Sequence, residues 1–362
     1  MPSLHRYPPT TDRSLRVSSQ ADELLLDWAR QSLLTDVPTT VVHDRFGAVA
    51  LRLSAPVQFI ASYHSQEEAL RRNAGGYLPA NVARLTDASP VTHQALLRVP
   101  KSLELFEYYL AYLGVNAVPG ARLAAGFMTR HFTPRLLEIS ARYAGTVTQS
   151  RARKKARLLL LSDLYLPAPE SGPRPMLRNV IDYQGARYTQ YYGVFSSQHV
   201  DFATQFLLDS WPDDLPAPAS ILDIGCGSGI IGDQLLRRYP AARLTATDDF
   251  SLAVASAREN LPADRATVRY AHTLATVADA SQELVVTNPP FHQGYENTLD
   301  TSLSLFGEVQ RVLTPAGQFF VVANRHLNYA THLRRLFREV TVVRENAKYV
   351  VYRCGRSPVL TE

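Results

Sequence analysis

An asparagine, two prolines and a phenylalanine, Asn288-Pro289-Pro290-Phe291, follow the apolar run 284–287. Proline holds the residue before it in extended backbone, so the apolar run is predicted to be a strand that ends at Asn288. In that geometry the side-chain oxygen of Asn288 and the carbonyl of Pro289 can both accept hydrogen bonds from one planar amine. Phe291 can stack on the ring that carries the amine. The pattern indicates chemistry on an amino nitrogen; a strand-ending turn is the structural alternative.

A glycine-rich stretch lies upstream, where the strand-like residues 221–224, apolar except for Asp223, run into Gly225-Cys226-Gly227-Ser228-Gly229. Glycines at alternate positions let the backbone turn sharply and approach a ligand closely. The spacing lacks the last interval of the dinucleotide fingerprint G-x-G-x-x-G. The next predicted strand, 242–247, ends in Asp248-Asp249, about 20 residues past the glycines, where an acid can bind both hydroxyls of a ribose. A helix cap is the structural alternative for that acid.

The glycine loop, the acid and the asparagine motif, in this order and spacing, resemble a class I S-adenosylmethionine-dependent methyltransferase of the amino-group type. The resemblance implies S-adenosylmethionine as cofactor and Asn288, Pro289 and Phe291 as catalytic residues. Asp248 would hold the ribose, and Asp223 would reach the methionine amine. The full set of cofactor-binding residues that we expect is Asp223, Gly225, Gly227, Gly229, Asp248, Asp249 and His272.

The composition describes a chain of 362 residues with 46% hydrophobic residues, which is long enough for two domains. No apolar run approaches the length of a membrane span, and residues 1–16 lack an apolar signal region. The two cysteines, Cys226 and Cys354, are too few for a disulfide framework or a zinc site. We therefore expect a cytoplasmic protein without a metal ion and without membrane contact.

Positive charge is concentrated between residues 122 and 157, where nine arginines and lysines face one acid, Glu138. Such a local field suits a phosphate backbone, with a solvated basic face as the alternative. Within the stretch, 147–161 is predicted to be a hairpin whose long side chains project outward. The residues predicted to bind RNA are Arg151, Arg153, Lys154, Lys155 and Arg157.

The chain is predicted to hold two related halves. Proline-rich residues 166–178 cannot continue a helix or a central strand, so they are the expected linker between domains 1–165 and 179–362. Residues 118–131 repeat the pattern of residues 313–326, with a turn that contains proline and glycine, a predicted strand (121–128 and 318–323) and an Arg-His pair. Where the glycine loop would stand in the first half, only Gly47 remains. We expect an α/β fold of two tandem Rossmann-like methyltransferase domains, the first of them degenerate.

The sequence resembles, over nearly its whole length, the bacterial ribosomal RNA guanine-N2 methyltransferases, and the large-subunit (23S) branch more than the small-subunit branch. Several motifs carry this resemblance: Asp44-Arg45-Phe46-Gly47-Ala48, Val99-Pro100-Lys101-Ser102-Leu103, Lys154-Lys155-Ala156-Arg157-Leu158, Val194-Phe195-Ser196, the glycine loop, Ala253-Val254-Ala255-Ser256, Asn288-Pro289-Pro290-Phe291-His292-Gln293 and Ala323-Asn324-Arg325-His326-Leu327-Asn328-Tyr329. Ser197 and His199 depart from the family pattern near the cofactor, as does His272 near the adenine.

The resemblance implies that the second domain methylates the N2 of a guanine in ribosomal RNA, and that the first domain holds the RNA. A base inside a duplex cannot reach such a pocket, so the guanine must be unpaired or flipped out, in free RNA or in a partly assembled subunit. Other readings are a 16S rRNA enzyme, a DNA adenine or protein glutamine methyltransferase, and a non-catalytic RNA-binding or assembly protein.

Overall fold

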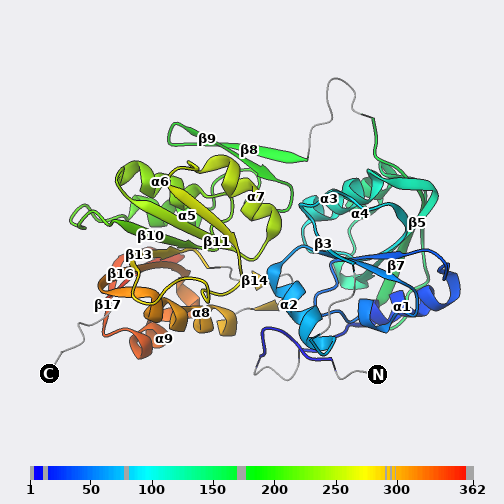
Figure 1. The fold of residues 1–362 in the computed structure, drawn as a ribbon, viewed down its shortest axis with the longest axis horizontal. Helices are drawn as coiled ribbons and strands as arrows, with labels where there is room; N and C mark the ends of the chain where they lie inside the picture. Colours follow the sequence, from blue (N-terminus) through cyan, green and yellow to red (C-terminus); the bar gives the residue numbers. More distant parts are fainter. Residues whose placement is uncertain are drawn as a thin grey trace. The chain divides into compact units, whose positions relative to one another are not determined.

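The computed structural model describes residues 4–10, 15–76, 81–168, 177–289, 292–293, 296–297 and 299–355. The chain divides into two compact units, residues 1–177 and 178–362. Figure 1 draws the first unit in blue to green and the second in green to red. The division falls inside the predicted linker 166–178, of which residues 169–176 lie outside the described part of the chain.

The second unit is built on a seven-stranded sheet with the order β12-β11-β10-β13-β16-β18-β17. The first five strands of this order are parallel, while β18 runs antiparallel to both β16 and β17. The strands are β10 (Ser220–Ile224), β11 (Arg243–Asp248), β12 (Ala266–Tyr270), β13 (Gln282–Thr287), β16 (Leu313–Asn324), β17 (Glu339–Glu345) and β18 (Tyr349–Gly355).

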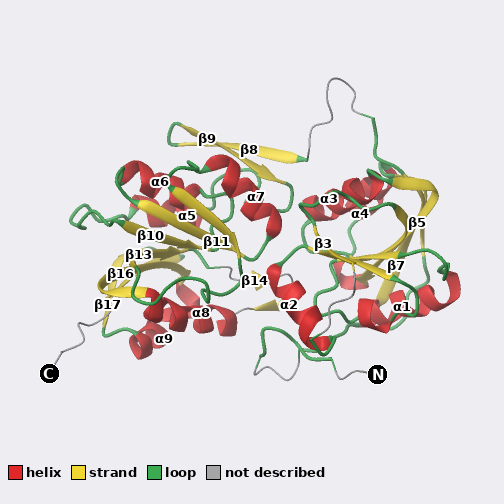
Figure 2. Cartoon of the chain, in the orientation of Figure 1, coloured by secondary structure: helices red, strands yellow, loops and turns green. Residues whose placement is uncertain are grey.

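Helices cover both faces of this sheet, as Figure 2 shows with α6 and α7 on one side and α8 and α9 on the other. They are α5 (Phe202–Asp209), α6 (Ile230–Arg238), α7 (Ser251–Asn260), α8 (Leu299–Val312), the short η3 (Arg325–Leu327) and α9 (Tyr329–Leu336). Successive side chains of a strand point to opposite faces. Accordingly, Ile221 packs in one core with Leu235 of α6, and Leu222 packs in the other with Phe306 of α8.

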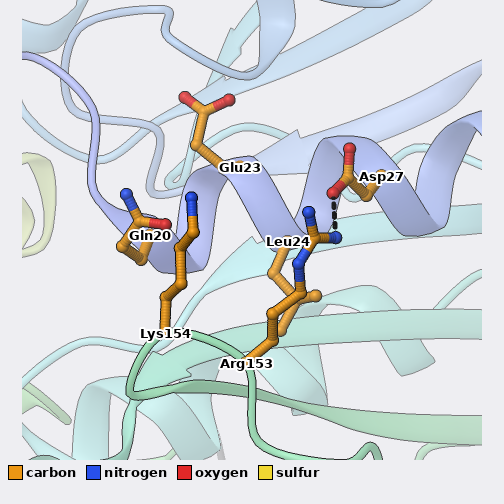
Figure 3. A pocket seen from close by; sticks show the side chains of 6 residues that line it. All are labelled: Gln20, Glu23, Leu24, Asp27, Arg153 and Lys154. Atoms are coloured by element: carbon orange, nitrogen blue, oxygen red, sulfur yellow. Dashed lines mark hydrogen bonds and ion pairs between the residues drawn. The ribbon is translucent and has the colours of Figure 1, made fainter.

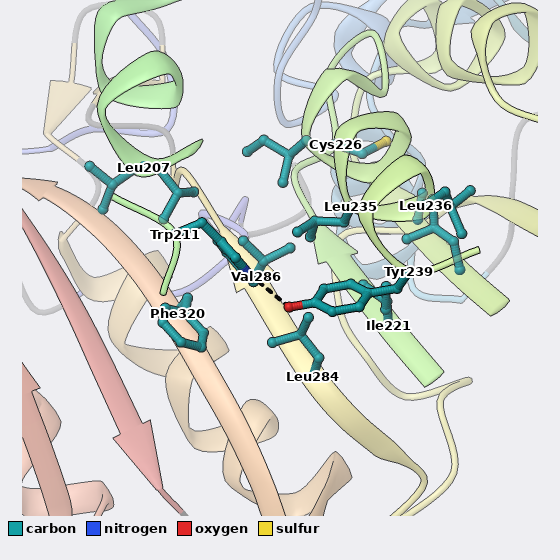
Figure 4. Close-up of a cluster of buried hydrophobic side chains, with 14 of the residues drawn as sticks. Leu207, Trp211, Ile221, Cys226, Leu235, Leu236, Tyr239, Leu284, Val286 and Phe320 are labelled. Atoms are coloured by element: carbon teal, nitrogen blue, oxygen red, sulfur yellow. Dashed lines mark hydrogen bonds between the residues drawn. The ribbon is translucent and has the colours of Figure 1, made fainter. Parts of the chain in front are cut away.

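The core beneath α5 and α6 joins apolar packing with one buried hydrogen bond (Figure 4). Leu207 of α5 and Phe320 of β16 are fully buried there. The indole Nε1 of Trp211 donates a hydrogen bond of 3.1 Å to the hydroxyl of Tyr239, which lets both large side chains enter the core without an unpaired polar atom. This core fixes α5 against the sheet.

A hairpin of β8 (Arg178–Tyr183) and β9 (Ala186–Tyr191) precedes the main sheet, with its turn at Gln184-Gly185. It lies on α6 and α7, because the hydroxyl of Tyr188 donates to Asp233 at 2.6 Å and Asn260 bonds the backbone of Thr189. The same Asn260 donates to the carbonyl of Ser228 in the glycine loop. Asn260 therefore joins the hairpin to the glycine loop. A second small sheet pairs β14 (His292–Gln293) with β15 (Glu296–Asn297).

The first unit has a sheet of the same order, β3-β2-β1-β4-β5-β7-β6. Its strands are β1 (Thr39–Val42), β2 (Val57–Ala61), β3 (Asn81–Arg84), β4 (Thr92–Arg98), β5 (Ala117–Met128), β6 (Ala144–Gln149) and β7 (Ala156–Leu164). Its helices are α1 (Gln20–Ser32), η1 (Ala50–Arg52), α2 (His64–Asn73), α3 (Leu103–Gly114), η2 (Thr129–His131) and α4 (Pro134–Ala141). The predicted fold of two tandem Rossmann-like domains is confirmed.

Within the described residues, no helix has the length and apolar character needed to cross a membrane.

Candidate functional site

The predicted site residues of the second unit meet at one edge of its sheet. Ile224 at the end of β10 is paired with Thr247 of β11 and with Thr287 of β13. Because these strands are parallel, the glycine loop after β10, the acids after β11 and the asparagine after β13 leave the sheet side by side. Ligands of open parallel sheets bind at this carboxyl edge.

The glycine loop has a left-handed backbone at all three glycines, with φ of 69° at Gly225, 55° at Gly227 and 86° at Gly229. A Cβ atom built on Gly225 or Gly227 meets no atom within 4 Å among the described residues, so these two glycines leave their backbone open to a ligand. A Cβ atom on Gly229 would lie 3.0 Å from Leu261 Cγ. Gly229 begins α6 and permits close packing onto Leu261 rather than facing the open side.

Asp223 is fully buried at the foot of this loop. Its Oδ2 accepts a hydrogen bond of 3.1 Å from the backbone N–H of Gly232, while Oδ1 has no hydrogen-bond partner among the described residues. Burial raises the pKa of Asp223 to about 7, and the nearby charge of Asp248 adds to the effect. Buried polar atoms are nearly always paired. An unpaired carboxylate oxygen beside an open loop fits a cationic or N–H donor on a ligand, as the cofactor's methionine amine is.

Asp248 holds the shape of the same edge. Its Oδ2 accepts from the N–H of Gly227 at 2.9 Å and its Oδ1 accepts from the N–H of Phe250 at 2.8 Å. Burial raises the pKa of Asp248 to about 6, with the charge of Asp249 as a further cause. Each carboxylate oxygen keeps a second lone pair that can accept a ribose hydroxyl. Asp249 and His272 are half-buried at this edge, since His272 follows the end of β12, which pairs with β11.

Asn288 is held by its amide nitrogen. Nδ2 donates one hydrogen bond of 2.9 Å to Oδ2 of Asp201 and another of 2.9 Å to Oγ1 of Thr204. Its Oδ1 is buried and has no hydrogen-bond partner in the part of the chain that the structure describes. Thr287, just before it, donates to the carbonyl of Ile224 at 2.7 Å and so ties this corner to β10. The amide therefore leaves one unpaired acceptor at the same edge of the sheet as the glycine loop.

The other predicted catalytic residues are placed in part. Pro289 is buried directly after Asn288, and Phe291 lies outside the described residues. The contacts of Asp201 and Thr204 with Asn288 are not predicted from the sequence. The available signal is Asp201 itself, because aspartate is favoured at a helix N-cap, which indicates a helix start and nothing about its neighbours.

These features fit S-adenosylmethionine. Gly225 and Gly227 can admit it, Asp223 can accept from its amine, and Asp248 can accept from its ribose. Burial raises the pKa of the Cys226 thiol in the loop, which keeps it an unreactive small side chain. In the described ranges, no group of three or more His, Cys, Asp or Glu side chains could hold a metal ion.

The predicted RNA-binding residues lie on the hairpin of β6 and β7 in the first unit. Arg151, Lys154 and Lys155 are exposed. Arg153 forms an ion pair of 2.5 Å with Asp27 of α1, so part of its charge is compensated (Figure 3). Arg157 is half-buried, and its Nη1 lies 3.4 Å from Oε1 of Gln149. The hairpin thus offers exposed cations at its tip and anchored arginines on either side.

The matching edge of the first unit is closed by its own side chains. The hydroxyl of Tyr109 is hydrogen-bonded to Nδ1 of His43 at 2.9 Å and to Oγ of Ser62 at 2.7 Å. Burial lowers the pKa of His43 to about 3, so the imidazole is neutral. The carboxylate of Asp44 accepts from three successive backbone N–H groups, those of Ala48, Val49 and Ala50. The side-chain and backbone groups that could bind a ligand at this edge are thus hydrogen-bonded to one another within the first unit.

Comparison with known proteins agrees with this geometry. The model of the Methyltransferase small domain matches residues 186–353, and the model of the RLMG N-terminal domain matches residues 2–164. The chain is 34% identical to ribosomal RNA large subunit methyltransferase G of Stutzerimonas stutzeri, covering 97% of this chain and 96% of that protein. It is 35% identical to the protein of the same name from Streptomyces coelicolor, with 96% of each chain covered.

A solved structure shares the whole fold. The T. thermophilus 16S rRNA N2 G1207 methyltransferase (RsmC), in complex with AdoMet and guanosine, superimposes with a TM-score of 0.75 at 23% identity, covering 96% of this chain and 94% of that one. At that identity the likeness establishes the two-unit fold. The relatives at 34% and 35% identity, which cover nearly the whole chain, establish the family. The chain belongs to the family of ribosomal RNA large subunit methyltransferase G.

Proposed function

We propose that this protein transfers a methyl group from S-adenosylmethionine to the exocyclic N2 of one guanine in ribosomal RNA, and that this RNA is the 23S rRNA. One observation carries the proposal. The amide of Asn288 is anchored by its nitrogen, and its oxygen has no hydrogen-bond partner among the described residues, at the carboxyl edge of the sheet where Gly225 and Gly227 open. The names of the relatives support ribosomal RNA of the large subunit as the substrate.

The chain's own groups account for the selection of an amine. When bound, S-adenosylmethionine supplies a methyl carbon on a sulfonium, which is strongly electrophilic. Guanine N2 is a weak nucleophile because its lone pair is delocalised into the ring. Asn288 Oδ1 and the carbonyl of Pro289 would accept its two hydrogens and favour a pyramidal nitrogen with an available lone pair. Holding the nitrogen in this orientation supplies most of the acceleration. The surplus proton can leave to water afterwards, so no strong base is required.

Contacts outside this edge would select the RNA. The exposed cations Arg151, Lys154 and Lys155 suit phosphates of structured RNA, which proteins hold mainly by backbone and shape. The target guanine must be unpaired or flipped out of its helix, which favours free or partly assembled RNA over a finished subunit. The cytoplasm is where such RNA is found in a bacterium.

The test is mass mapping of methylated nucleosides in ribosomal RNA from cells with and without this gene. We expect one N2-methylguanosine to disappear from the 23S rRNA of the deletion strain and to return on complementation. Its loss from 16S rRNA instead would assign the small-subunit substrate. An unchanged rRNA map, with loss of methyladenine from DNA or of methylglutamine from a protein, would overturn the proposal.

Replacement of the anchored asparagine tests the mechanism in vitro. Asn288→Ala should lower the rate of methyl transfer by on the order of 10²–10³, the usual cost of removing one preorganised hydrogen-bonding group beside the reacting atoms. The affinity for S-adenosylmethionine should stay nearly unchanged, because Asp223, Asp248 and the glycines are intact. A variant that methylates RNA at nearly the wild-type rate would remove Asn288 from the mechanism.

A further inference from the structure

Two residues at the N-terminal end of α5 accept hydrogen bonds from the side-chain amide of Asn288. Asp201 is the N-cap of this helix, and Thr204 lies in its first turn, 7% exposed. Both accept a hydrogen bond of 2.9 Å from the same atom, Asn288 Nδ2. The two N–H groups of that amide are therefore both used, and neither is available to a substrate. Asp201 and Thr204 are called the amide clamp below.

The clamp fixes which end of the amide faces away from Asp201. An ionised carboxylate is an acceptor only, so the group of Asn288 that faces Asp201 must be the NH2. Rotation of the amide by a half turn would bring its oxygen against the carboxylate oxygen of Asp201, and two acceptors would then face each other without a proton. The clamp excludes that orientation and directs Oδ1 away from Asp201, and this oxygen has no partner among the described residues.

Asp201 is itself held in place by backbone hydrogen bonds and by the packing of α5. Oδ2 of Asp201, which accepts from Asn288, also accepts from the backbone N–H of Ala203 at 3.0 Å and of Thr204 at 3.1 Å. These are helix N-terminal donors that would otherwise lack a partner. Ala203 and Leu207 anchor the same helix, with 1% and 0% of their surface exposed. The position of Asp201 is thus set by the helix and by the core beneath it.

We propose that Asp201 and Thr204 are positioning residues for methyl transfer, which orient the Asn288 amide so that Oδ1 accepts from the target amine. The inference rests on the proposed function, because it concerns how that reaction selects and orients its nitrogen. The clamp touches neither the RNA nor the cofactor in this assignment. Its removal should therefore lower kcat while the affinities for both substrates stay close to those of the wild type.

Thr204 supplies the cleanest experiment, because its hydroxyl can be removed without a change in volume. Thr204→Val deletes one of the two acceptors, and Thr204→Ser restores it. We expect kcat of the valine variant to fall about 10-fold, since small displacements of a reacting group are costly, with KM for RNA and Kd for S-adenosylmethionine within about twofold. The serine variant should return to within about twofold of the wild-type kcat.

A matched control lies at the other end of the same helix. Ser210 is buried, and its hydroxyl donates to the carbonyl of Phe206, far from Asn288 along α5. Ser210→Ala also removes one buried hydroxyl from α5 and should lower the melting temperature about as much as Thr204→Val. Its kcat should be that of the wild type. An equal loss of kcat in Ser210→Ala would show that only the stability of α5 matters and would overturn the proposal.

Asp201 is tested by Asp201→Ser, because serine is a good N-cap but is too short to reach Asn288 as well. We expect kcat to fall about 100-fold with the helix retained, as followed by melting temperature and far-UV circular dichroism. Asp201→Asn can place its oxygen where Oδ2 stands and should recover most of the activity. If Asp201→Ser and Thr204→Val both keep kcat within about threefold while Asn288→Ala is inactive, the clamp is refuted and the role of Asn288 stands.

Failure of the proposed function looks different. In that case the wild-type protein itself leaves guanine N2 of every ribosomal RNA unmethylated, before any variant is compared. The same ratios of kcat are then measured on the amine that the wild-type protein does methylate. A loss in Thr204→Val that serine rescues would support the clamp on that substrate, and unchanged ratios would refute it.

Discussion

At the residue scale, the fully buried carboxylate of Asp223 and the half-buried one of Asp248 show a cost in stability. Asp223 and Asp248 stand at the ends of adjacent strands, and burial raises the pKa of the first to about 7 and of the second to about 6. Asp248 has backbone donors on both oxygens, whereas Oδ1 of Asp223 has no partner among the described residues. A protein built for stability alone would place an amide or an apolar group at Asp223. The unpaired oxygen is explained by a ligand.

The first prediction follows from the raised pKa of Asp223. Between about pH 4 and pH 7 the folded state holds a proton that the unfolded chain has lost, so the free energy of unfolding falls as the pH rises. Asp223→Asn removes this proton-linked loss and keeps an oxygen to accept from Gly232 N–H. We expect the variant to be at least as stable as the wild type at pH 8, and to bind S-adenosylmethionine at least about 10-fold more weakly.

Denaturant unfolding at pH 5 and pH 8 checks the stability half of this prediction, and calorimetric titration of the cofactor checks the binding half. The difference in stability between the two pH values should be smaller in Asp223→Asn than in the wild type. An unchanged pH dependence would mean that Asp223 has an ordinary pKa, and unchanged cofactor affinity would mean that Oδ1 faces something else.

The sequence predicts some residues of this site and misses others for a physical reason. Gly225 and Asn288 directly follow strands of a parallel sheet and Asp248 ends one, and that rule alone brings them to one edge. The contact between Asp201 and Asn288 joins residues 87 positions apart, on a helix and a loop. No local pattern encodes how a helix N-terminus docks under a particular loop, so the clamp becomes visible only once the chain is folded.

At the scale of elements, the hairpin of β6 and β7 carries a strained turn. Arg153 and Ala156 exchange two backbone hydrogen bonds of 2.9 Å, and the two residues between them have left-handed backbones, with φ of 48° at Lys154 and 62° at Lys155. Asparagine and glycine are favoured at these positions because a left-handed backbone is costly for other residues. Lysines in this turn place two charges at its tip at the expense of stability.

The second prediction separates charge from fold in this turn. Lys154→Asn plus Lys155→Gly relieves the left-handed backbones, so the free energy of unfolding should rise by about 1 kcal/mol. Affinity for structured RNA should fall, and the slope of log affinity against log salt should flatten by roughly 0.7–0.9 for each phosphate that the variant no longer neutralises. Thermal melting and filter binding at several salt concentrations measure the two effects.

A matched control retains the charges. Lys154→Arg plus Lys155→Arg keeps both cations and both strained positions, so its RNA affinity and its stability should equal those of the wild type. If the uncharged variant binds RNA as tightly as the wild type with an unchanged salt slope, then the RNA footprint lies away from this hairpin.

In the two strands that contain a proline, the sequence pattern predicts the strand but not the residue at which it begins. The sequence predicts strands at 121–128 and 318–323, after a Pro-Gly turn, whereas β5 begins at Ala117 and β16 at Leu313. The pairing jumps from Thr92↔Ala117 to Gln94↔Arg122, and the same jump occurs between Gln282 and Leu284. The proline and glycine lie in a bulge, where a missing N–H is tolerated, so the strand begins before it.

At the scale of the whole molecule, the two units share one sheet topology, but the carboxyl edge of the sheet is open in the second unit and occupied by side chains in the first. Both sheets have the same strand order, counted from the start of each unit. In the second unit the loop after the central strand is open at Gly225 and Gly227. In the first unit the residue after the central strand is His43, which is hydrogen-bonded to Tyr109. The topology is thus retained without the ligand site, as the survival of Gly47 alone suggests from the sequence.

The last prediction is the stoichiometry of cofactor binding. Since the hydroxyl of Tyr109 is hydrogen-bonded to both His43 and Ser62, and Asp44 accepts from the backbone N–H groups of residues 48–50, the first unit has no open loop at this edge among its described residues. Calorimetric titration of the full chain with S-adenosylmethionine should therefore give one site per chain.

Variants assign that single site to the second unit. Gly225→Val adds a branched side chain where φ is 69°, and Asp248→Ala removes the ribose acceptor, so the double variant should show no measurable heat of binding. Tyr109→Phe breaks the hydrogen bonds to His43 and Ser62 in the first unit and should leave both affinity and stoichiometry unchanged. Two sites in the wild type, or one site that survives in the double variant, would show that the first unit still binds the cofactor and that its closed edge can open.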